Sequence, residues 1–430
     1  MRYFFVLGKN PTLSFAEIAV VLSLKPEQVL YLSKEAAVVE TEDEIDAQSL
    51  IRKLGGTIKI GVVNAQLSII NAQSIFNEKI FNDARNDRKF NFGFSYYGEG
   101  KLEDEKQLAM EIKKTLKEKG VSSRWVTSRE KVLSSVVVEQ NKLTGERGVE
   151  VVIIKNENNF FTGKTLAVQP FKELSARDYG RPMRDDYSGM LPPKIALIML
   201  NLFIDTGTDK HGLITDEYRS QITLLDPFCG SGTILTEAAL MGFKNLIGCD
   251  KSEKAVSDTK QNLEWIAKQY PRPTAQAGAA ISNIPASPAG RQYQIFQCDV
   301  QRLSSKIKLN SVAAIVTEPY LGPARGKRNL VAMEKIAREL EQLYHQAILQ
   351  FEKVLQPQGR VVMIWPVFVL ARNEKMFLNT KNILKNSSFQ KVNPLQGFNN
   401  KVLRLSDRGT LLYGREGQKI EREILILEKK

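Results

Sequence analysis

The segment Leu224–Thr233 reads LLDPFCGSGT and contains the pattern that decides the fold of this chain. An apolar strand ends at Asp226, a turn with Gly230 and Gly232 follows, and a helix is expected to begin near Thr233. Doubly wound sheets bind ligands where their strands end, and glycine lets the backbone approach a ligand closely because it has no β-carbon. The segment therefore predicts a ligand-binding turn, although a glycine-rich turn alone would equally suit a nucleotide.

The residues after about 194 alternate between strand and helix patterns. This alternation predicts an α/β fold with a doubly wound, mostly parallel sheet and helices on both faces. A segment rich in Ala, Pro, Gly and Ser, 271–290, interrupts the pattern and is expected to be an insertion at the rim of the sheet. The expected strands are 222–225, 245–248, 294–297, 311–316 and 359–365, and the expected helices are 194–204, 234–241, 252–269 and 330–354.

Acidic residues stand at the ends of the next expected strands. Asp250 lies 24 residues after Asp226, in IGCD, where its carboxylate can accept hydrogen bonds from a ribose diol. Asp299, in QCDV, follows the third strand and could accept from an adenine amino group. VTEPYLGP, at 316–323, ends the fourth strand. The series suits a cofactor that contains adenosine.

The front of the chain predicts two small α/β units. Residues 1–66 follow the order βαββαβ, and Ser14 with Glu17 forms an S-x-x-E pattern that predicts a capping box at a helix start. Residues 67–168 follow, and 169–193 have the Pro, Gly and mixed charge of a connector. The expected strands are 3–7, 29–31, 36–39, 57–63, 90–98, a strand near 125, 132–138, 149–154 and 160–168, and the expected helices are 45–54, 104–119 and one from residue 14.

The charge of the chain favours a polyanionic partner. The 430 residues, enough for two or three domains, have a formal net charge of +13. Residues 1–50 contain 4 basic and 8 acidic residues, whereas 302–430 contain 23 and 11. Cations that neutralise phosphates release condensed counterions and so bind nucleic acid; a merely soluble basic protein is the alternative.

The numbers of cysteine and histidine residues and the lengths of the apolar runs bear on metal binding and on the cellular compartment. With 3 Cys and 2 His, no zinc-binding spacing exists, so we expect reduced thiols, no metal and a cytoplasmic protein. No run of eighteen apolar residues suggests a membrane span. Oligomeric state cannot be read from these features.

The series DPFCGSGT, GCD, CDV and TEPYLG resembles the Rossmann-like methyltransferases that modify exocyclic amines. DPFCGSGTILTEAAL is similar to the tRNA guanine-2-amine methyltransferases that carry a THUMP domain, and MRYFFVLGKNPTLSFAEI resembles their N-terminal domain, especially in the subgroup acting on the guanosine at tRNA position ten. RPM, MLPPKIA and LNL before the turn, and GREGQKIEREILIL near the C-terminus, are similar too. The resemblance covers nearly the whole chain except 271–290.

The resemblance implies an organisation and a function. It implies a ferredoxin-like domain at 1–66, a THUMP RNA-binding domain at 67–168, a linker at 169–193 and a Rossmann-like class I methyltransferase domain at 194–430. It implies S-adenosylmethionine as cofactor, tRNA as partner and methylation of the guanine 2-amine. Some relatives also require a small activating subunit.

The resemblance also implies roles for residues of the cofactor site. Asp226, Gly230 and Gly232 are expected to shape the cofactor loop, Asp250 to hold the ribose and Asp299 the adenine. Neighbouring residues complete the expected site, namely Pro227, Cys229, Thr233, Lys251 and Val300.

The catalytic motif departs from the family pattern, which is Asp-Pro-Pro-Tyr followed by glycine. In the preferred register, Glu318 stands for the aspartate, Pro319 for the first proline and Tyr320 for the second; the alternative register puts Thr317 in the place of the aspartate. Glu318 would accept a hydrogen bond from the reacting amine and offset its growing positive charge. Tyr320 would stack on an extruded base.

Basic residues are expected to contact RNA in two places. Arg325, Lys327 and Arg328 follow the catalytic motif and could hold phosphates beside the target nucleotide. The family implies that the THUMP unit grips the tRNA acceptor end, and we expect Lys113, Lys117, Arg124 and Lys131 to contribute there.

Two other functions remain open from the sequence. Related motifs also serve adenine or cytosine amines of other RNA or DNA. The irregular TEPYLG motif would also suit a catalytically impaired homologue that binds tRNA without turnover.

Overall fold

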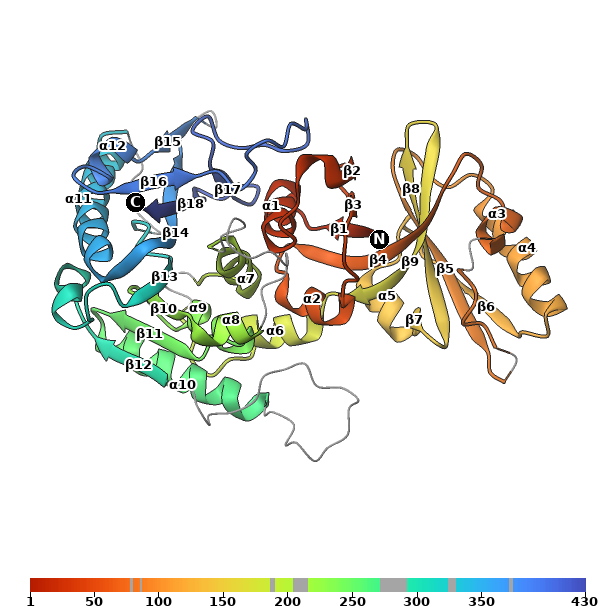
Figure 1. The fold of residues 1–430 in the computed structure, drawn as a ribbon, viewed down its shortest axis with the longest axis horizontal. Coiled ribbons are helices and arrows are strands. Elements are labelled where there is room, and N and C mark those ends of the chain that lie inside the picture. Colours follow the sequence, from red (N-terminus) through yellow and green to blue (C-terminus); the bar gives the residue numbers. More distant parts are fainter. Residues whose placement is uncertain are drawn as a thin grey trace. The chain divides into compact units, whose positions relative to one another are not determined.

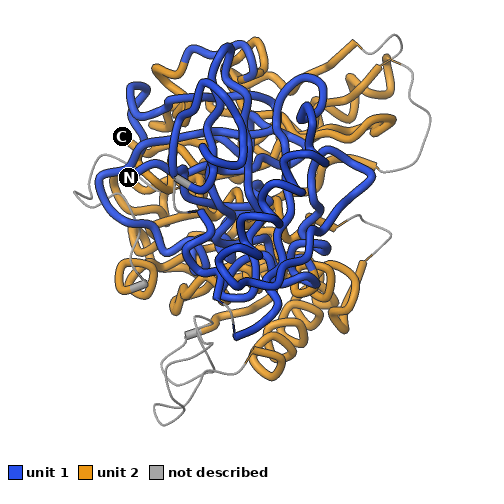
Figure 2. The backbone as a smooth tube through the Cα atoms, turned by 90° about the vertical axis from the view of Figure 1, so that its right-hand side faces the viewer, with its two compact units in different colours: residues 1–15, 24–171, 399–402 blue, residues 16–23, 172–398, 403–430 orange. Residues whose placement is uncertain are grey.

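A computed structural model describes most of the chain, which separates into two compact units. Unit 1 comprises residues 1–15, 24–171 and 399–402, and unit 2 comprises 16–23, 172–398 and 403–430 (Figure 2). Each unit is described below by itself. The described residues are 1–77, 80–85, 87–185, 190–203, 216–270, 292–323, 330–370 and 374–430.

Unit 1 is built on one sheet with the strand order β2-β3-β1-β4-β9-β8-β5-β6, and β7 pairs with β8 (Figure 1). Strand β4 pairs with β9 antiparallel, so the sheet continues from the segment 1–66 into the segment 67–168. The strands are β1 (Arg2–Leu7), β2 (Val29–Leu32), β3 (Ala36–Glu40), β4 (Thr57–Leu67), β5 (Phe90–Tyr97), β6 (Ser123–Val126), β7 (Thr144–Gly145), β8 (Gly148–Asn156) and β9 (Asn159–Val168).

The helices of the front half confirm most of the expected elements and correct two. They are α1 (Pro11–Val21), η1 (Pro26–Gln28), α2 (Ala47–Lys53), α3 (Ala72–Asn77), α4 (Glu105–Glu118) and α5 (Ser135–Gln140). The strand expected at 132–138 is wrong, because α5 begins there with Ser134 as its N-cap. The capping box at Ser14 is also wrong. Helix α1 begins at Pro11, the Asn10 side chain accepts from the Leu13 N–H (3.1 Å), and the Ser14 hydroxyl donates to the Gly56 carbonyl (2.7 Å).

Unit 2 contains the doubly wound sheet that the sequence predicts. Its order is β12-β11-β10-β13-β14-β18-β16, and all pairs from β12 to β14 are parallel. Strand β18 is antiparallel to both β14 and β16. The order reverses between β10 and β13, which is where such sheets bind ligands. The strands are β10 (Thr223–Asp226), β11 (Asn245–Asp250), β12 (Gln292–Gln297), β13 (Val312–Thr317), β14 (Leu355–Val369), β15 (Lys375–Phe377), β16 (Phe389–Val392), β17 (Leu411–Tyr413) and β18 (Ile420–Lys429).

Alternating strand residues give this sheet two apolar faces. Leu225 of β10 and Ile315 of β13 pack in one core cluster with Tyr344 and Phe351 of α11 (Leu330–Val354). Their strand neighbours point to the opposite face because side chains alternate along a strand. The other helices of unit 2 are α6 (Phe171–Tyr179), α7 (Pro193–Leu202), α8 (Asp216–Gln221), α9 (Thr233–Leu240), α10 (Glu253–Gln269), η2 (Val300–Ser305) and α12 (Thr380–Ile383).

The expected linker at 169–193 includes regular structure. Helix α6 occupies nine of its residues, and Arg177 forms a buried ion pair with Glu237 of α9, with Nε to Oε1 at 2.7 Å. The pair anchors the connector to the helix that follows the glycine turn. The expected insertion at 271–290 lies outside the described residues.

Candidate active site

A cavity of about 540 Å³ lies at the carboxyl ends of β10, β11, β12 and β13. It is therefore at the edge of the sheet where the strand order reverses. All the expected cofactor and catalytic residues except Gly232 line it. Those that do are Asp226, Pro227, Cys229, Gly230, Thr233, Asp250, Lys251, Asp299, Val300, Glu318, Pro319 and Tyr320.

Gly230 and Gly232 have different structural roles in the loop. At Gly230 (φ +51°), an added β-carbon would meet no atom within 4 Å, so the bare backbone faces the open cavity. At Gly232 (φ +83°), a β-carbon would lie 2.9 Å from Cγ2 of Thr259 on α10. Gly232 thus shapes the loop by permitting its close packing on α10; unlike Gly230, it does not line the cavity.

Asp226 is buried at the base of the cavity. Its Oδ1 accepts hydrogen bonds from the Thr317 hydroxyl (2.7 Å) and from the Phe228 N–H (3.3 Å). Desolvation by burial raises the pKa of Asp226 to about 7. Because the Thr317 side chain is buried against Asp226 and does not line the cavity, the geometry favours the register in which Glu318 takes the place of the family aspartate.

Asp250 and Asp299 lie at the ends of adjacent strands, as the spacing predicts. Asp250 accepts from the Gly230 N–H through Oδ2 (3.1 Å) and from the Ser252 N–H through Oδ1 (2.9 Å). A carboxylate has about four lone-pair sites, so it can still accept from a ribose diol. Asp299 caps η2 by accepting from the Gln301 N–H (2.9 Å).

Cys229 lies in the loop as an inert thiol. It is buried, and burial raises its pKa well above the ordinary value. The Thr259 hydroxyl donates to the neighbouring Gly230 carbonyl (2.8 Å), which fixes the loop over α10. Cys229 therefore shapes the wall of the cavity rather than reacting.

The charge of the cavity fits S-adenosylmethionine, which carries a sulfonium and an ammonium group. Among the described lining residues, Lys254 is paired with Asp258 and Arg422 with Glu318, so acidic groups remain in excess. An acidic cavity favours a cationic ligand over a polyphosphate. The charged lining residues are Asp185, Asp226, Asp250, Asp258, Asp299, Glu318, Lys251, Lys254 and Arg422.

The segment after β13 places its residues at the mouth of the cavity. Glu318 Oε1 accepts a hydrogen bond from Arg422 Nε of β18 at 2.5 Å. Pro319 is buried, Tyr320 is 57% exposed, and the Tyr344 hydroxyl donates to the Tyr320 carbonyl at 2.7 Å. The exposed Tyr320 ring is available for stacking. Sequence reasoning did not single out Arg422 or Tyr344. Arg422 lies within GREGQKIEREILIL, but nothing in that stretch indicates a contact with Glu318.

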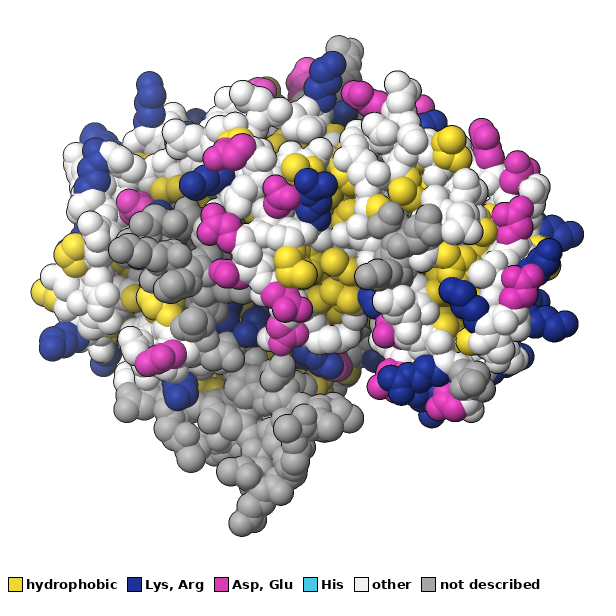
Figure 3. Space-filling view, turned by 45° about the vertical axis from the view of Figure 1, so that its right-hand side comes forward, with side chains coloured by type: hydrophobic (Ala, Val, Ile, Leu, Met, Phe, Trp, Pro, Cys, Tyr) yellow, Lys and Arg dark blue, Asp and Glu magenta, His cyan; other side chains and the backbone are white. Residues whose placement is uncertain are grey.

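The expected RNA-binding residues of unit 1 divide into two groups. Lys113 and Lys117 lie on α4 and Arg124 on β6, without an ion-pair partner in the described part of the chain. Lys131 is engaged instead, because its Nζ pairs with Glu35 (2.9 Å) and donates to the Gly98 carbonyl (2.7 Å). This ion pair makes Lys131 a weaker candidate for contact with a phosphate than the other three. Figure 3 shows basic side chains interleaved with acidic ones on the face that it draws.

Arg325, Lys327 and Arg328 lie outside the described residues. The described part of the chain contains no helix both long and apolar enough to cross a membrane. Within those same ranges, no group of three or more His, Cys, Asp or Glu side chains is arranged to hold a metal ion.

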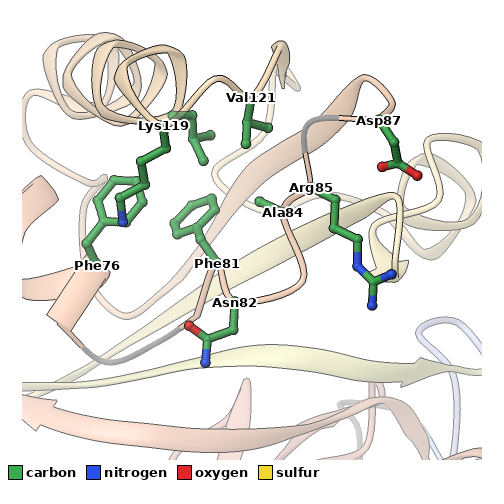
Figure 4. A pocket seen from close by; sticks show the side chains of 9 residues that line it. Phe76, Phe81, Asn82, Ala84, Arg85, Asp87, Lys119 and Val121 are labelled. Carbon is green, nitrogen blue, oxygen red and sulfur yellow. The ribbon is translucent and has the colours of Figure 1, made fainter.

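A second cavity, of about 350 Å³, lies in unit 1 beside Phe76, Phe81 and Lys119 (Figure 4). The rings of Phe76 and Phe81 stack with their centroids 4.9 Å apart, and Lys119 Nζ lies 4.8 Å from the centroid of Phe76. Both rings pack with the apolar core of this unit, and Phe81 is only 6% exposed. They do not form an open surface for stacking a base.

A known protein family matches the segment that contains most of the residues lining the cavity. A family model described as an RMKL-like methyltransferase domain matches residues 215–368. These residues contain the glycine turn, Asp250, Asp299 and Glu318, but not Arg422.

The chain is also similar to two curated archaeal proteins, both named tRNA (guanine(10)-N2)-dimethyltransferase. That of Methanocaldococcus jannaschii is 32% identical over 200 residues, which cover 45% of each chain. That of Methanothermobacter thermautotrophicus is 28% identical over 217 residues, which cover 50% of each. The chain thus spans about half the length of the curated relatives it matches. The crystal structure of TrmN from Thermus thermophilus aligns over 100% of both chains, with 15% identity and a TM-score of 0.45.

Proposed function

We propose that this protein transfers a methyl group from S-adenosylmethionine to the exocyclic 2-amino group of a guanosine in tRNA, at position ten. The observation that carries the proposal is the shared cavity, in which the Gly230 turn and Asp250 face the same space as Glu318 and Tyr320. The names of both curated relatives support guanine as the base and ten as the position.

Some residues of the cavity bind the cofactor, and others act on the base. Asp250 holds the ribose, Asp299 the adenine, and the bare backbone at Gly230 admits the cofactor to the cavity. S-adenosylmethionine supplies an electrophilic methyl group when it is bound. The acidic lining that includes Asp250 and Asp299 balances the positive charge of the cofactor.

Glu318 and Tyr320 act on the base. Tyr320 stacks on the extruded guanine, since enzymes that modify a base first take it out of the helix. Glu318 accepts a hydrogen bond from the 2-amine and holds the nitrogen in line with the methyl carbon. The carbon–nitrogen bond forms as the carbon–sulfur bond breaks, the electron pair remains on sulfur, and the surplus amine proton leaves to water.

RNA binding by unit 1 completes the proposal. Lys113, Lys117 and Arg124 present cations that suit the phosphates of an A-form helix, where proteins read shape and backbone rather than base edges. Residues 67–168 would then act as the THUMP unit that grips the acceptor end.

The test is Glu318→Gln, which keeps the size of the side chain and removes its charge. We expect methyl transfer to unmodified tRNA to fall by about 100-fold, while the Kd for the cofactor changes by less than about threefold. The rate is measured in single turnover with labelled cofactor, and the Kd by calorimetry.

Glu428→Gln is the matched control. Glu428 is also paired with an arginine of the same sheet, Arg360 (Nε to Oε2 2.7 Å), but it does not line the cavity. Equal rates for wild type and Glu318→Gln would refute the role of Glu318. Cofactor binding without methyl transfer by the wild type would instead indicate a protein that binds tRNA without turnover.

A further inference from the structure

Arg422 is the cation that reaches the carboxylate at the centre of the proposed chemistry. It lies on β18, opposite Pro366 of β14, and donates from Nε to Glu318 Oε1 at 2.5 Å. The two side chains are only 13% and 14% exposed, so water screens the pair weakly. Among the described residues, Glu318 Oε2 accepts no hydrogen bond. One oxygen is therefore fixed and the other remains available in the cavity.

We propose that Arg422 is a positioning residue, which holds Glu318 so that Oε2 meets the amine of the target base. This inference rests on the proposed function and deepens it. Glutamate has one methylene more than the family's aspartate and therefore one more rotatable bond. The contact with Arg422 restricts that freedom and offsets the departure from the motif.

The alternation of side chains along β18 leaves Arg422 available for this contact. Its neighbours Glu421 and Glu423 point to the opposite face, because side chains alternate along a strand. Glu421 pairs there with Lys375 (2.6 Å), and Glu423 pairs with Arg408 and accepts from the Thr410 hydroxyl (2.5 Å). Neither acid competes with Glu318 for the guanidinium.

Other titratable groups also lie near Glu318. Desolvation raises the pKa of Asp226 on β10, and the charges of Asp250 and Glu318 add to that rise. Desolvation and then the charge of Glu318 also raise the pKa of Tyr344 on α11, so its hydroxyl stays protonated. Neither group is a cation, and among the described residues Arg422 is the one that pairs with Glu318.

A carboxylate held in this way assists methyl transfer without taking the amine proton. The proton released when the carbon–nitrogen bond forms goes to water. A hydrogen bond from the amine to Oε2 still aligns the nitrogen and offsets its charge. Arg422 thus acts through Glu318 rather than on the base.

The experiment measures single-turnover methyl transfer at saturating tRNA, and the Kd for the cofactor, for wild type, Arg422→Met, Arg422→Lys and the control Arg360→Met. Arg360 forms the comparable pair with Glu428 in the same sheet but does not line the cavity. We expect Arg422→Met to lower the rate by about 10- to 100-fold while the Kd for the cofactor changes by less than about threefold. Arg422→Lys should recover much of the rate, and Arg360→Met should match wild type.

A double-mutant cycle separates positioning from folding. In the Glu318→Gln background, Arg422→Met should have little further effect, because the group through which it acts has lost its charge. An unchanged rate in Arg422→Met, or an equal loss of rate in both backgrounds, would overturn the inference alone. A wild-type protein that transfers no methyl group to tRNA would overturn the proposed function and this inference together.

Discussion

Asp226 couples the stability of unit 2 to pH. Desolvation raises its pKa from the ordinary value of 3.8 to about 7. Between these pH values the folded protein retains a proton that the unfolded chain has lost. This contribution to stability is therefore complete below about pH 4 and is lost as the pH rises to about 7.

Asp226→Asn is expected to remove that dependence. The difference between variant and wild type in the free energy of unfolding should grow from pH 4 to pH 7, by at most about 1.4 kcal/mol per pH unit. Thermal midpoints of the cofactor-free proteins, compared across this range, measure it. A difference that does not vary with pH would contradict the assignment.

At the scale of single residues, local spacing decided what could be predicted. Asp226, Asp250 and Glu318 follow parallel strands, so their convergence at one edge follows from the alternation of strand and helix. The contact of Arg422 with Glu318 joins residues 104 positions apart and depends on the register of β18, which no local pattern specifies. The partner of Lys131, Glu35, is similarly remote.

At the scale of elements, the two glycines of the turn before α9 mainly affect different properties. Gly230 is expected to affect ligand binding, and Gly232 the stability of the fold. Gly230→Ala also carries the cost of a positive φ, about 1–2 kcal/mol, but it places a methyl group in the open cavity, so we expect at least tenfold weaker cofactor binding as its larger effect. Gly232→Ala adds contact with Thr259 to the cost of a positive φ, so we expect a loss of about 2–4 kcal/mol in unfolding free energy. Calorimetric titration and thermal unfolding of both variants test this contrast. Equal effects of the two substitutions on both properties would count against it.

The elements that sequence reasoning missed are short. Ser134 and the valines that follow it suit a strand by composition, yet a serine N-cap and tertiary packing produce the six-residue helix α5. Helix α6 lies in a segment whose Pro and Gly suggested a loop, and the buried pair of Arg177 and Glu237 stabilises it there. The long helix α11, with its regular apolar stripe, was predicted to the residue.

For the whole molecule, we expect the basic residues of unit 1 to be of two kinds: those that contact phosphates of tRNA, and one that is held by an ion pair within the protein. Replacing Lys113, Lys117 and Arg124 together by Gln should weaken tRNA binding and reduce the slope of log K against log salt by about 0.7 to 0.9 per lost phosphate contact. Lys131→Gln should leave that slope unchanged, because Lys131 is already paired with Glu35. Filter binding across a salt series measures both. An equal change of slope in the triple variant and in Lys131→Gln would contradict this division of the basic residues.

The sheet of unit 1 is a feature that the sequence did not reveal. The expected units 1–66 and 67–168 each have their own strand pattern, but pairing of β4 with β9 makes one continuous sheet. Such pairing joins strands about a hundred residues apart, and periodicity along the chain contains no information about it.

Mass analysis of tRNA nucleosides and of ribonuclease fragments, after incubation of unmodified tRNA with the protein and labelled S-adenosylmethionine, tests the central claim most directly. We expect label on the 2-amine of the guanosine at position ten with the wild-type protein, and almost none with Glu318→Gln. Label on adenosine or cytidine, or no label in any nucleoside, would contradict it.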